Sequence, residues 1–176
     1  MIEIIVNELE KAGIDFAFIG GIAVAAAGFP RFTEDIDILI NSKDFEKTHT
    51  IMLRLDYKPF QTTEEFALYE SALKYFGNID FMLAHRQYSI NMLQRAKYKD
   101  FYGGKLKVKV IDPEDVIGLK LQAFVNNPKR NQDLVDIENV IKINKTTLDM
   151  GRIKEYFSIF NKDALLDEIL RRISND

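Results

Sequence analysis

The spacing of hydrophobic residues changes from segment to segment and predicts alternating helices and strands. Residues 2–11 repeat apolar positions every three or four residues, which predicts a helix that stops at Gly13. Residues 15–19 and 34–40 are short apolar runs, which predict two buried strands. The alanine-rich residues 22–28 between them predict a compact helix. The N-terminal part therefore has a mixed α/β pattern.

The middle of the chain continues this mixture. Residues 43–55 predict a helix capped by Asn41 and Ser42, and residues 57–83 hold short strand-like runs between polar breaks. Residues 86–97 predict another helix, and the strict alternation of residues 103–111 predicts a strand.

The last third of the chain has only helical patterns. Asp112, Pro113 and two following acids form a strong helix start, and that helix is expected to reach Asn126. Further helices are expected over residues 130–143 and 149–174, with a break near Asn161. We therefore predict an α/β (α+β) protein, with a mixed-sheet core over residues 1–111 flanked by helices and a helical region over residues 112–176 packed on it.

Composition and charge narrow the classes of function. The chain has 176 residues, no cysteine and two histidines, so thiolate metal sites are excluded and histidine-based zinc sites are disfavoured. Neither a signal peptide nor a membrane-spanning run is found, which favours a cytoplasmic protein that does not enter membranes. Residues 85–109 hold seven basic residues and one acid, whereas residues 1–84 hold 14 acids and 7 basic residues. This basic stripe suits an anionic partner such as RNA, and a solvated lysine-rich hairpin explains it equally well.

The most informative polar residues are Asp35 and Asp37, which lie in an apolar run. Alternation places both on one face of the expected strand, about 7 Å apart, where like charges repel. A divalent cation would relieve this repulsion, because carboxylate oxygens are ligands that Mg²⁺ prefers. The alternative is a strand face in contact with water. Asp80, which also follows apolar residues, is a third candidate ligand, and three such acids suit two-metal phosphoryl transfer.

The pair Gly20-Gly21 separates a predicted strand from a predicted helix. Glycines at such a turn let the backbone approach a phosphate closely, and the helix start adds free N–H groups. Neither a P-loop nor a dinucleotide-binding glycine pattern is present, and a lone glycine pair is more often only a tight turn. The order of strand, glycine pair, helix and paired acids is more specific than any one of these features.

These motifs, FIGGIAVAAAG and RFTEDIDILI, resemble those of the nucleotidyltransferase superfamily, which includes DNA polymerase beta and minimal nucleotidyltransferases. The chain is most similar to the AbiEii-type nucleotidyltransferases, which include toxins of toxin–antitoxin systems. The resemblance implies nucleotide binding by Gly20, Gly21, Arg31 and Thr33. It also implies that Asp35, Asp37 and Asp80 hold Mg²⁺ or Mn²⁺, and that Asp80 helps activate the acceptor.

The resemblance extends to two later segments, VIDPEDVIGLKLQAF and PKRNQDLVDIENV. It implies that Lys120 holds the triphosphate and that Asp133, with Asp136 beside it, positions this lysine or the nucleotide. The implied reaction is transfer of a nucleotidyl group from a nucleoside triphosphate to an acceptor hydroxyl. One acceptor is an RNA 3′ end such as that of tRNA. The resemblance also implies an antitoxin protein as a partner. There are two alternatives. The enzyme could act on a small-molecule acceptor such as an antibiotic, or the protein could be inactive and keep only the binding fold.

Overall fold

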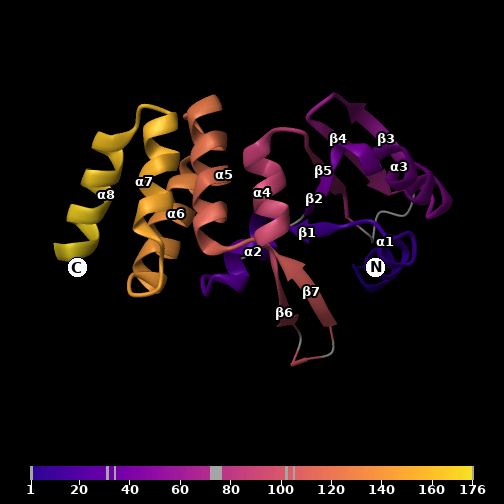
Figure 1. The fold of residues 1–176 in the computed structure, drawn as a ribbon, viewed down its shortest axis with the longest axis horizontal. Helices are drawn as coiled ribbons and strands as arrows, with labels where there is room; N and C mark the ends of the chain where they lie inside the picture. Colours follow the sequence, from indigo (N-terminus) through magenta and orange to yellow (C-terminus); the bar gives the residue numbers. More distant parts are fainter. Residues whose placement is uncertain are drawn as a thin grey trace. The chain divides into compact units, whose positions relative to one another are not determined.

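The computed structural model describes residues 2–30, 32–33, 35–71, 77–101, 103–104 and 106–175. The chain forms two compact units (Figure 1). The first comprises Met1–Ile22 and Phe32–Ile111, and the second comprises Ala23–Arg31 and Asp112–Asp176. The packing of residues 112–176 on the core stays a prediction.

The first unit is built on a seven-stranded mixed sheet with the strand order β3-β4-β5-β2-β1-β7-β6. The strands are β1 (Phe16–Phe18), β2 (Ile36–Asn41), β3 (Tyr57–Thr62), β4 (Phe66–Ser71), β5 (Ile79–Ala84), β6 (Lys97–Phe101) and β7 (Leu106–Val110). β2 pairs antiparallel with β1 and parallel with β5, so it lies near the centre of the sheet. The predicted α/β (α+β) class is confirmed.

The central strands carry the core of the first unit. Ile38, Leu39 and Ile40 are fully buried, so the second half of β2 is covered on both faces of the sheet. Burial on both faces explains why this stretch is an uninterrupted apolar run. The first two residues of β2, Ile36 and Asp37, are only partly buried, and Asp35 comes just before them.

Helices and turns complete the first unit. They are α1 (Ile2–Lys11), the 3₁₀ turn η1 (Ser42–Asp44), α3 (Phe45–Arg54) and α4 (Gln87–Arg95). α4 packs against β2 and β5, and α1 packs against α3. The Asn41 side chain accepts a hydrogen bond from the Lys43 backbone N–H and so caps the 3₁₀ turn η1. The predicted cap therefore lies one turn before the α-helix, because α3 begins at Phe45 after Asp44, whose side chain makes no capping hydrogen bond.

The second unit is helical. It contains α5 (Pro113–Asn126), α6 (Asn131–Asn144), α7 (Met150–Ile159) and α8 (Asp163–Asn175). Helix α2 (Gly20–Ala26) begins in the first unit, and its residues from Ala23 belong to the second. Asn161, with φ of 54°, separates α7 from α8 as predicted. No helix of the described residues is both long and apolar enough to cross a membrane.

The acids at the start of α5 also make contacts with α7. Pro113 holds the first helical position as predicted, but the Asp112 side chain makes no capping hydrogen bond. Asp115 is fully buried and accepts a hydrogen bond from the Tyr156 hydroxyl at 2.6 Å. The Arg152 guanidinium lies 3.5 Å from Asp112 and 3.9 Å from Asp115. These contacts tie α7 to the start of α5.

Several boundaries differ from the sequence predictions, including those of β2, β6 and β7. β2 begins at Ile36, so Asp35 lies just before the strand and not within it. Residues 97–101 form the edge strand β6, which was not predicted as a strand. Its residues are mostly exposed and largely charged, so the sequence shows no alternation of apolar and polar positions there. The predicted strand over residues 103–111 is shorter, at Leu106–Val110. The beginning of the strand-like run over residues 73–83, up to residue 76, lies outside the described residues.

Candidate active site

Asp37 and Asp80 lie opposite each other on neighbouring parallel strands. Asp37 is the second residue of β2 and pairs in register with Asp80 of β5. Residues paired in register lie on the same face of a sheet, so both carboxylates belong to one face. Asp35 comes two residues before Asp37, and the structure leaves all three acids partly exposed. The fold therefore brings together Asp37 and Asp80, which are 43 positions apart in the sequence.

The acids influence one another electrostatically. Burial, reinforced by the negative charges of Asp37 and Asp35, raises the pKa of Asp80 to about 6. Like charges disfavour ionisation, so this edge of the sheet would be stabilised by a cation. A strongly raised pKa caused by burial and a specific charge is typical of a functional site.

Gly20, the first residue of the glycine pair, lies directly against Asp37. Gly20 has a φ of 57°, a left-handed conformation that favours glycine. A β-carbon added to Gly20 would lie 1.9 Å from Asp37 Oδ2, so no larger residue fits unless Asp37 moves. The Ile19 backbone N–H donates to the Asp37 carbonyl oxygen at 3.0 Å and fixes the turn to β2.

Gly21 is similarly close to Thr33. A β-carbon on Gly21 would lie 2.6 Å from the Thr33 β-carbon. The Thr33 hydroxyl donates to the Asp35 carbonyl oxygen at 3.0 Å, so Thr33 links the glycine turn to the paired acids. Five predicted nucleotide or metal residues therefore lie together, namely Gly20, Gly21, Thr33, Asp35 and Asp37. Arg31, which was predicted to join them, lies outside the described residues.

The donor set suits a hard divalent cation. Mg²⁺ is usually held by one or two carboxylates and fills its shell with water and substrate phosphate, and Asp37 with Asp80 offers such a pair. Among the described residues, no three acidic or histidine side chains converge closely enough to form a complete cage. The arrangement therefore fits a site in which the substrate supplies the remaining ligands.

The second unit holds the other predicted residues, Lys120, Asp133 and Asp136. Lys120 Nζ donates to Asp133 Oδ1 at 2.8 Å and lies 3.0 Å from Asp136 Oδ2. All three residues are buried. The 3.0 Å contact between Lys120 Nζ and Asp136 Oδ2 lacks hydrogen-bond geometry and is an ion pair. Asp133 thus touches the lysine that the resemblance implies it positions.

Sequence reasoning did not single out Arg130. Its Nε donates to Asp133 Oδ2 at 2.6 Å from outside the buried cluster. The only sequence signal is its spacing, three residues before Asp133 at the start of α6. An exposed arginine in a polar loop carries no hydrophobic periodicity, which explains why the pattern of the chain did not reveal it.

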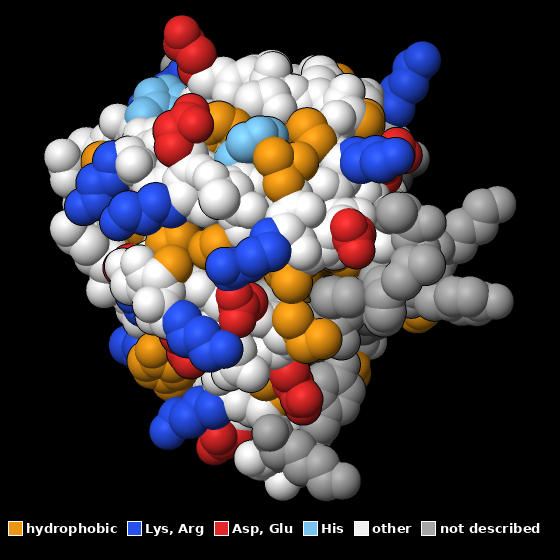
Figure 2. All heavy atoms as spheres, turned by 90° about the vertical axis from the view of Figure 1, so that its right-hand side faces the viewer, with side chains coloured by type: hydrophobic (Ala, Val, Ile, Leu, Met, Phe, Trp, Pro, Cys, Tyr) orange, Lys and Arg blue, Asp and Glu red, His pale blue; other side chains and the backbone are white. Residues whose placement is uncertain are grey.

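Most of the basic stripe lies on the hairpin of β6 and β7 (Figure 1), whereas Arg86 and Arg95 lie at the two ends of α4. The charge of the stripe is partly compensated. Lys109 Nζ donates to Asp15 at 2.6 Å, and Asp100 lies opposite Lys107. Lys97 and Lys99 are exposed on the edge strand. The stripe members Tyr102 and Lys105 lie outside the described residues. Figure 2 shows one face of the molecule, on which described acidic and basic side chains are interspersed.

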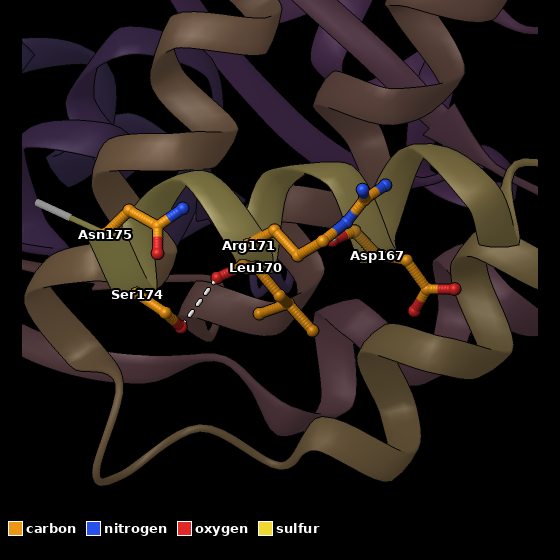
Figure 3. Close-up of a pocket in the computed structure, with 5 residues that line it drawn as sticks. All are labelled: Asp167, Leu170, Arg171, Ser174 and Asn175. Atoms are coloured by element: carbon orange, nitrogen blue, oxygen red, sulfur yellow. Dashed lines mark hydrogen bonds between the residues drawn. The ribbon is translucent and has the colours of Figure 1, made fainter.

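A shallow hollow is found on α8 and does not contain the predicted residues. Its lining consists of Asp167, Leu170, Arg171, Ser174 and Asn175, all from one helix (Figure 3). The Ser174 hydroxyl donates within the helix to the Leu170 carbonyl oxygen at 2.8 Å. One helix face with an internal hydrogen bond offers no convergent chemistry, so we do not regard this hollow as the active site.

Solved structures with a similar fold are nucleotidyltransferases. The antibiotic-resistance factor ANT(2'')-Ia has a TM-score of 0.67 at 14% identity, over 97% of this chain and 95% of that one. The lincosamide antibiotic adenylyltransferase LnuA, bound to lincomycin, has a TM-score of 0.59 at 16% identity, over 81% of this chain and 95% of that one. An antigenic nucleotidyltransferase-like protein from Paracoccidioides brasiliensis has a TM-score of 0.56 at 19% identity, over 97% of this chain and 91% of that one. At these identities the likeness shows the fold.

The family follows from the sequence itself. A comparison with curated proteins found no match. A family model described as "Nucleotidyl transferase AbiEii toxin, Type IV TA system" matches residues 5–175, which is nearly the whole chain. The predicted resemblance is therefore confirmed, and the chain belongs to the AbiEii nucleotidyltransferase family.

Proposed function

We propose that this nucleotidyltransferase uses a divalent cation, Mg²⁺ or Mn²⁺, and that Asp35, Asp37 and Asp80 form the metal-binding edge of its active site. The observation that carries the proposal is the contact network of Gly20, Asp37 and Asp80. The glycine turn lies against one carboxylate, and the second carboxylate is paired with it across two strands. A phosphate that approaches the turn would therefore arrive beside both acids.

The reaction would proceed by in-line displacement. The acceptor hydroxyl oxygen bonds to the α-phosphorus of the nucleoside triphosphate, and the bond from that phosphorus to the oxygen bridging the α- and β-phosphorus breaks. Pyrophosphate leaves, and the nucleotidyl group stays on the acceptor. A bound divalent cation would neutralise negative charge on the phosphates and on the leaving group.

Asp80 is the proposed acceptor of the hydroxyl proton. Its raised pKa of about 6 makes it a better base than an ordinary carboxylate while leaving it mostly ionised at neutral pH. Gly20, Gly21, Arg31 and Thr33 would position the triphosphate. Lys120 is proposed to hold the triphosphate, and Asp133 to position this lysine or the nucleotide.

The proposed acceptor is an RNA 3′ end such as that of tRNA. Two exposed lysines on β6, Lys97 and Lys99, and the toxin description of the family support this choice. An antitoxin partner is proposed on the same family description. A small-molecule acceptor is the second candidate, because LnuA, which shares the fold, is an antibiotic adenylyltransferase.

Replacement of both paired acids tests this function. Asp35→Ala with Asp37→Ala is expected to abolish incorporation of labelled nucleotides into total RNA, while circular dichroism shows an unchanged fold. A control with Glu10→Ala and Glu64→Ala removes two exposed acids from the same unit and should keep activity. Normal incorporation by the double variant of the paired acids would refute the proposal. An inactive binding protein would instead show no incorporation in the wild type.

A further inference from the structure

The Thr33 hydroxyl uses its proton on the backbone of Asp35. Thr33 Oγ1 donates to the Asp35 carbonyl oxygen at 3.0 Å. A threonine hydroxyl has one proton to donate and two lone pairs that accept. Ionised phosphate oxygens accept hydrogen bonds and cannot donate them, so a bond to a phosphate would need the same proton. While the bond to Asp35 is kept, Thr33 therefore has no proton to donate to a triphosphate.

The rest of the Thr33 side chain packs against Gly21. A β-carbon added to Gly21 would lie 2.6 Å from the Thr33 β-carbon, 2.8 Å from Oγ1 and 3.1 Å from Cγ2. The left-handed glycines of the described residues include Gly20 but not Gly21, so the closeness of Thr33 is what excludes a larger residue at position 21. Branching at the β-carbon restricts the rotamers of threonine. The contact with Gly21 therefore helps to keep the hydroxyl directed at Asp35.

Asp35 lies just outside the sheet. Among the described residues, the pairing of β2 with β5 begins at Ile36. The Asp37 carbonyl oxygen accepts a hydrogen bond from the Ile19 N–H at 3.0 Å, so contacts between strands hold the second acid of the motif. The Thr33 hydroxyl supplies a hydrogen bond to the first acid, at a position that the strand pairing does not reach.

We propose that Thr33 is a positioning residue for the metal-binding edge, and that its hydroxyl fixes the backbone of Asp35 instead of binding the triphosphate. Thr33 would then help to position the triphosphate only through the acid beside which the cation binds. Groups that orient metal ligands without touching the metal are an ordinary part of metal sites, and their loss lowers metal affinity. This inference rests on the proposed function, since it concerns the acids that are proposed there to hold the cation.

A set of variants separates a positioning role from a phosphate-binding role. Thr33→Val removes the hydroxyl and keeps the branched shape that packs on Gly21, whereas Thr33→Ser keeps the hydroxyl. Thr50→Val is the matched control, because the Thr50 hydroxyl also donates to a backbone carbonyl oxygen, that of Glu46 at 2.9 Å, from an exposed position of α3. Thr33→Ala, which also removes the hydroxyl, takes the place of Thr33→Val if urea unfolding shows that the valine variant does not fold.

The measurement is calorimetric titration with Mn²⁺ and with analogues of the four nucleoside triphosphates that carry a methylene group between the α- and β-phosphorus, so that no transfer occurs. We expect Thr33→Val to raise the Mn²⁺ concentration needed for half-saturation by about 10-fold to 100-fold. At saturating Mn²⁺, Thr33→Val should bind the analogue as tightly as the wild type does, because the phosphate contacts are intact. Thr33→Ser and Thr50→Val should match the wild type in both titrations.

An unchanged Mn²⁺ requirement in Thr33→Val, together with a raised requirement in Asp37→Asn, would overturn the inference while the proposed function stands. A loss of analogue affinity in Thr33→Val that persists at saturating Mn²⁺ would show that the hydroxyl binds phosphate, and would also overturn the inference. Failure of the wild type to bind any analogue at any Mn²⁺ concentration would overturn both the inference and the proposed function.

Discussion

The carboxylate of Asp37 lies against the backbone of Gly20, so that a β-carbon on Gly20 would be 1.9 Å from Asp37 Oδ2. This contact joins the turn between β1 and α2 to the acid pair on β2 and β5. It gives the glycine a steric role at the site in addition to its left-handed φ of 57°. The glycine pair and the paired acids therefore act as one structural feature.

Gly20→Ala should abolish nucleotidyl transfer, because the methyl group must displace the Asp37 carboxylate. Gly13→Ala is the matched control, since Gly13 has a similar φ of 67° but nothing within 4 Å of an added β-carbon. Both variants place alanine in a left-handed backbone conformation, which costs about 1–2 kcal/mol, but only Gly20→Ala displaces the Asp37 carboxylate. Steady-state incorporation and urea unfolding of both variants check this, and equal activities would contradict the steric account.

Asp80→Asn should stabilise the metal-free protein above pH 6. The pKa of Asp80 is about 6 in the folded protein against an ordinary 3.8, so the folded state binds more protons between these values. The free energy of unfolding contributed by Asp80 therefore falls as pH rises through this window and stays low above it. Asp80→Asn does not undergo this loss of stability. The difference in free energy of unfolding between the variant and the wild type should therefore vanish near pH 4.

Urea unfolding in EDTA across pH 4–8 measures the effect. Asp100→Asn, at an exposed position of β6, controls for the loss of a carboxylate and should show no such pH-dependent advantage. Added Mg²⁺ should stabilise the wild type more than Asp80→Asn. An Asp80→Asn protein that is less stable than the wild type at pH 8 in EDTA would contradict the electrostatic account.

Lys120→Met should destabilise the second unit by about 3–5 kcal/mol, because the change leaves Asp133 and Asp136 buried without their shared cation. Both carboxylates are at most 2% exposed, so water cannot replace the ammonium. Lys129→Met, at an exposed position, should change the free energy of unfolding little. Equal unfolding midpoints for the two variants would show that the buried ion pairs are not needed for stability.

Tyr156→Phe should destabilise the protein by about 1.5–3 kcal/mol, since it removes a hydrogen bond to a charged group. The hydroxyl donates to the fully buried Asp115 at 2.6 Å, and the ring of phenylalanine otherwise fills the same space. Tyr98→Phe, where the side chain is 57% exposed, serves as the control. Urea unfolding of both variants decides the matter, and a neutral Tyr156→Phe would contradict a structural role for this bond.

The sequence predicted individual residues better than their partners. Asp37 and Asp80 stood out because each interrupts an apolar run, but their register could not be predicted. Two further strands, β3 and β4, separate β2 from β5 in the sequence, and which strands pair depends on the packed sheet. The closeness of Gly20 to Asp37 depends on the same sheet geometry.

The second unit shows a different limit. Lys120 and Asp133 lie on different helices, α5 and α6, and only the resemblance linked them before the structure showed their contact. The edge strand β6 was missed because four of its five residues are exposed, so no buried face marks its alternation. Arg130 was missed because an exposed side chain at a helix start leaves no pattern.

The fate of two radioactive labels tests the central claim most directly. Wild-type protein is incubated with Mg²⁺ and nucleoside triphosphates labelled at the α- or the γ-phosphate, with RNA, protein or an aminoglycoside as acceptor. We predict that the α-label appears on an acceptor and the γ-label in pyrophosphate, and that Asp37→Asn abolishes both. Transfer of the γ-label to an acceptor, or α-label transfer that is unchanged in Asp37→Asn, would contradict nucleotidyl transfer at this acid pair.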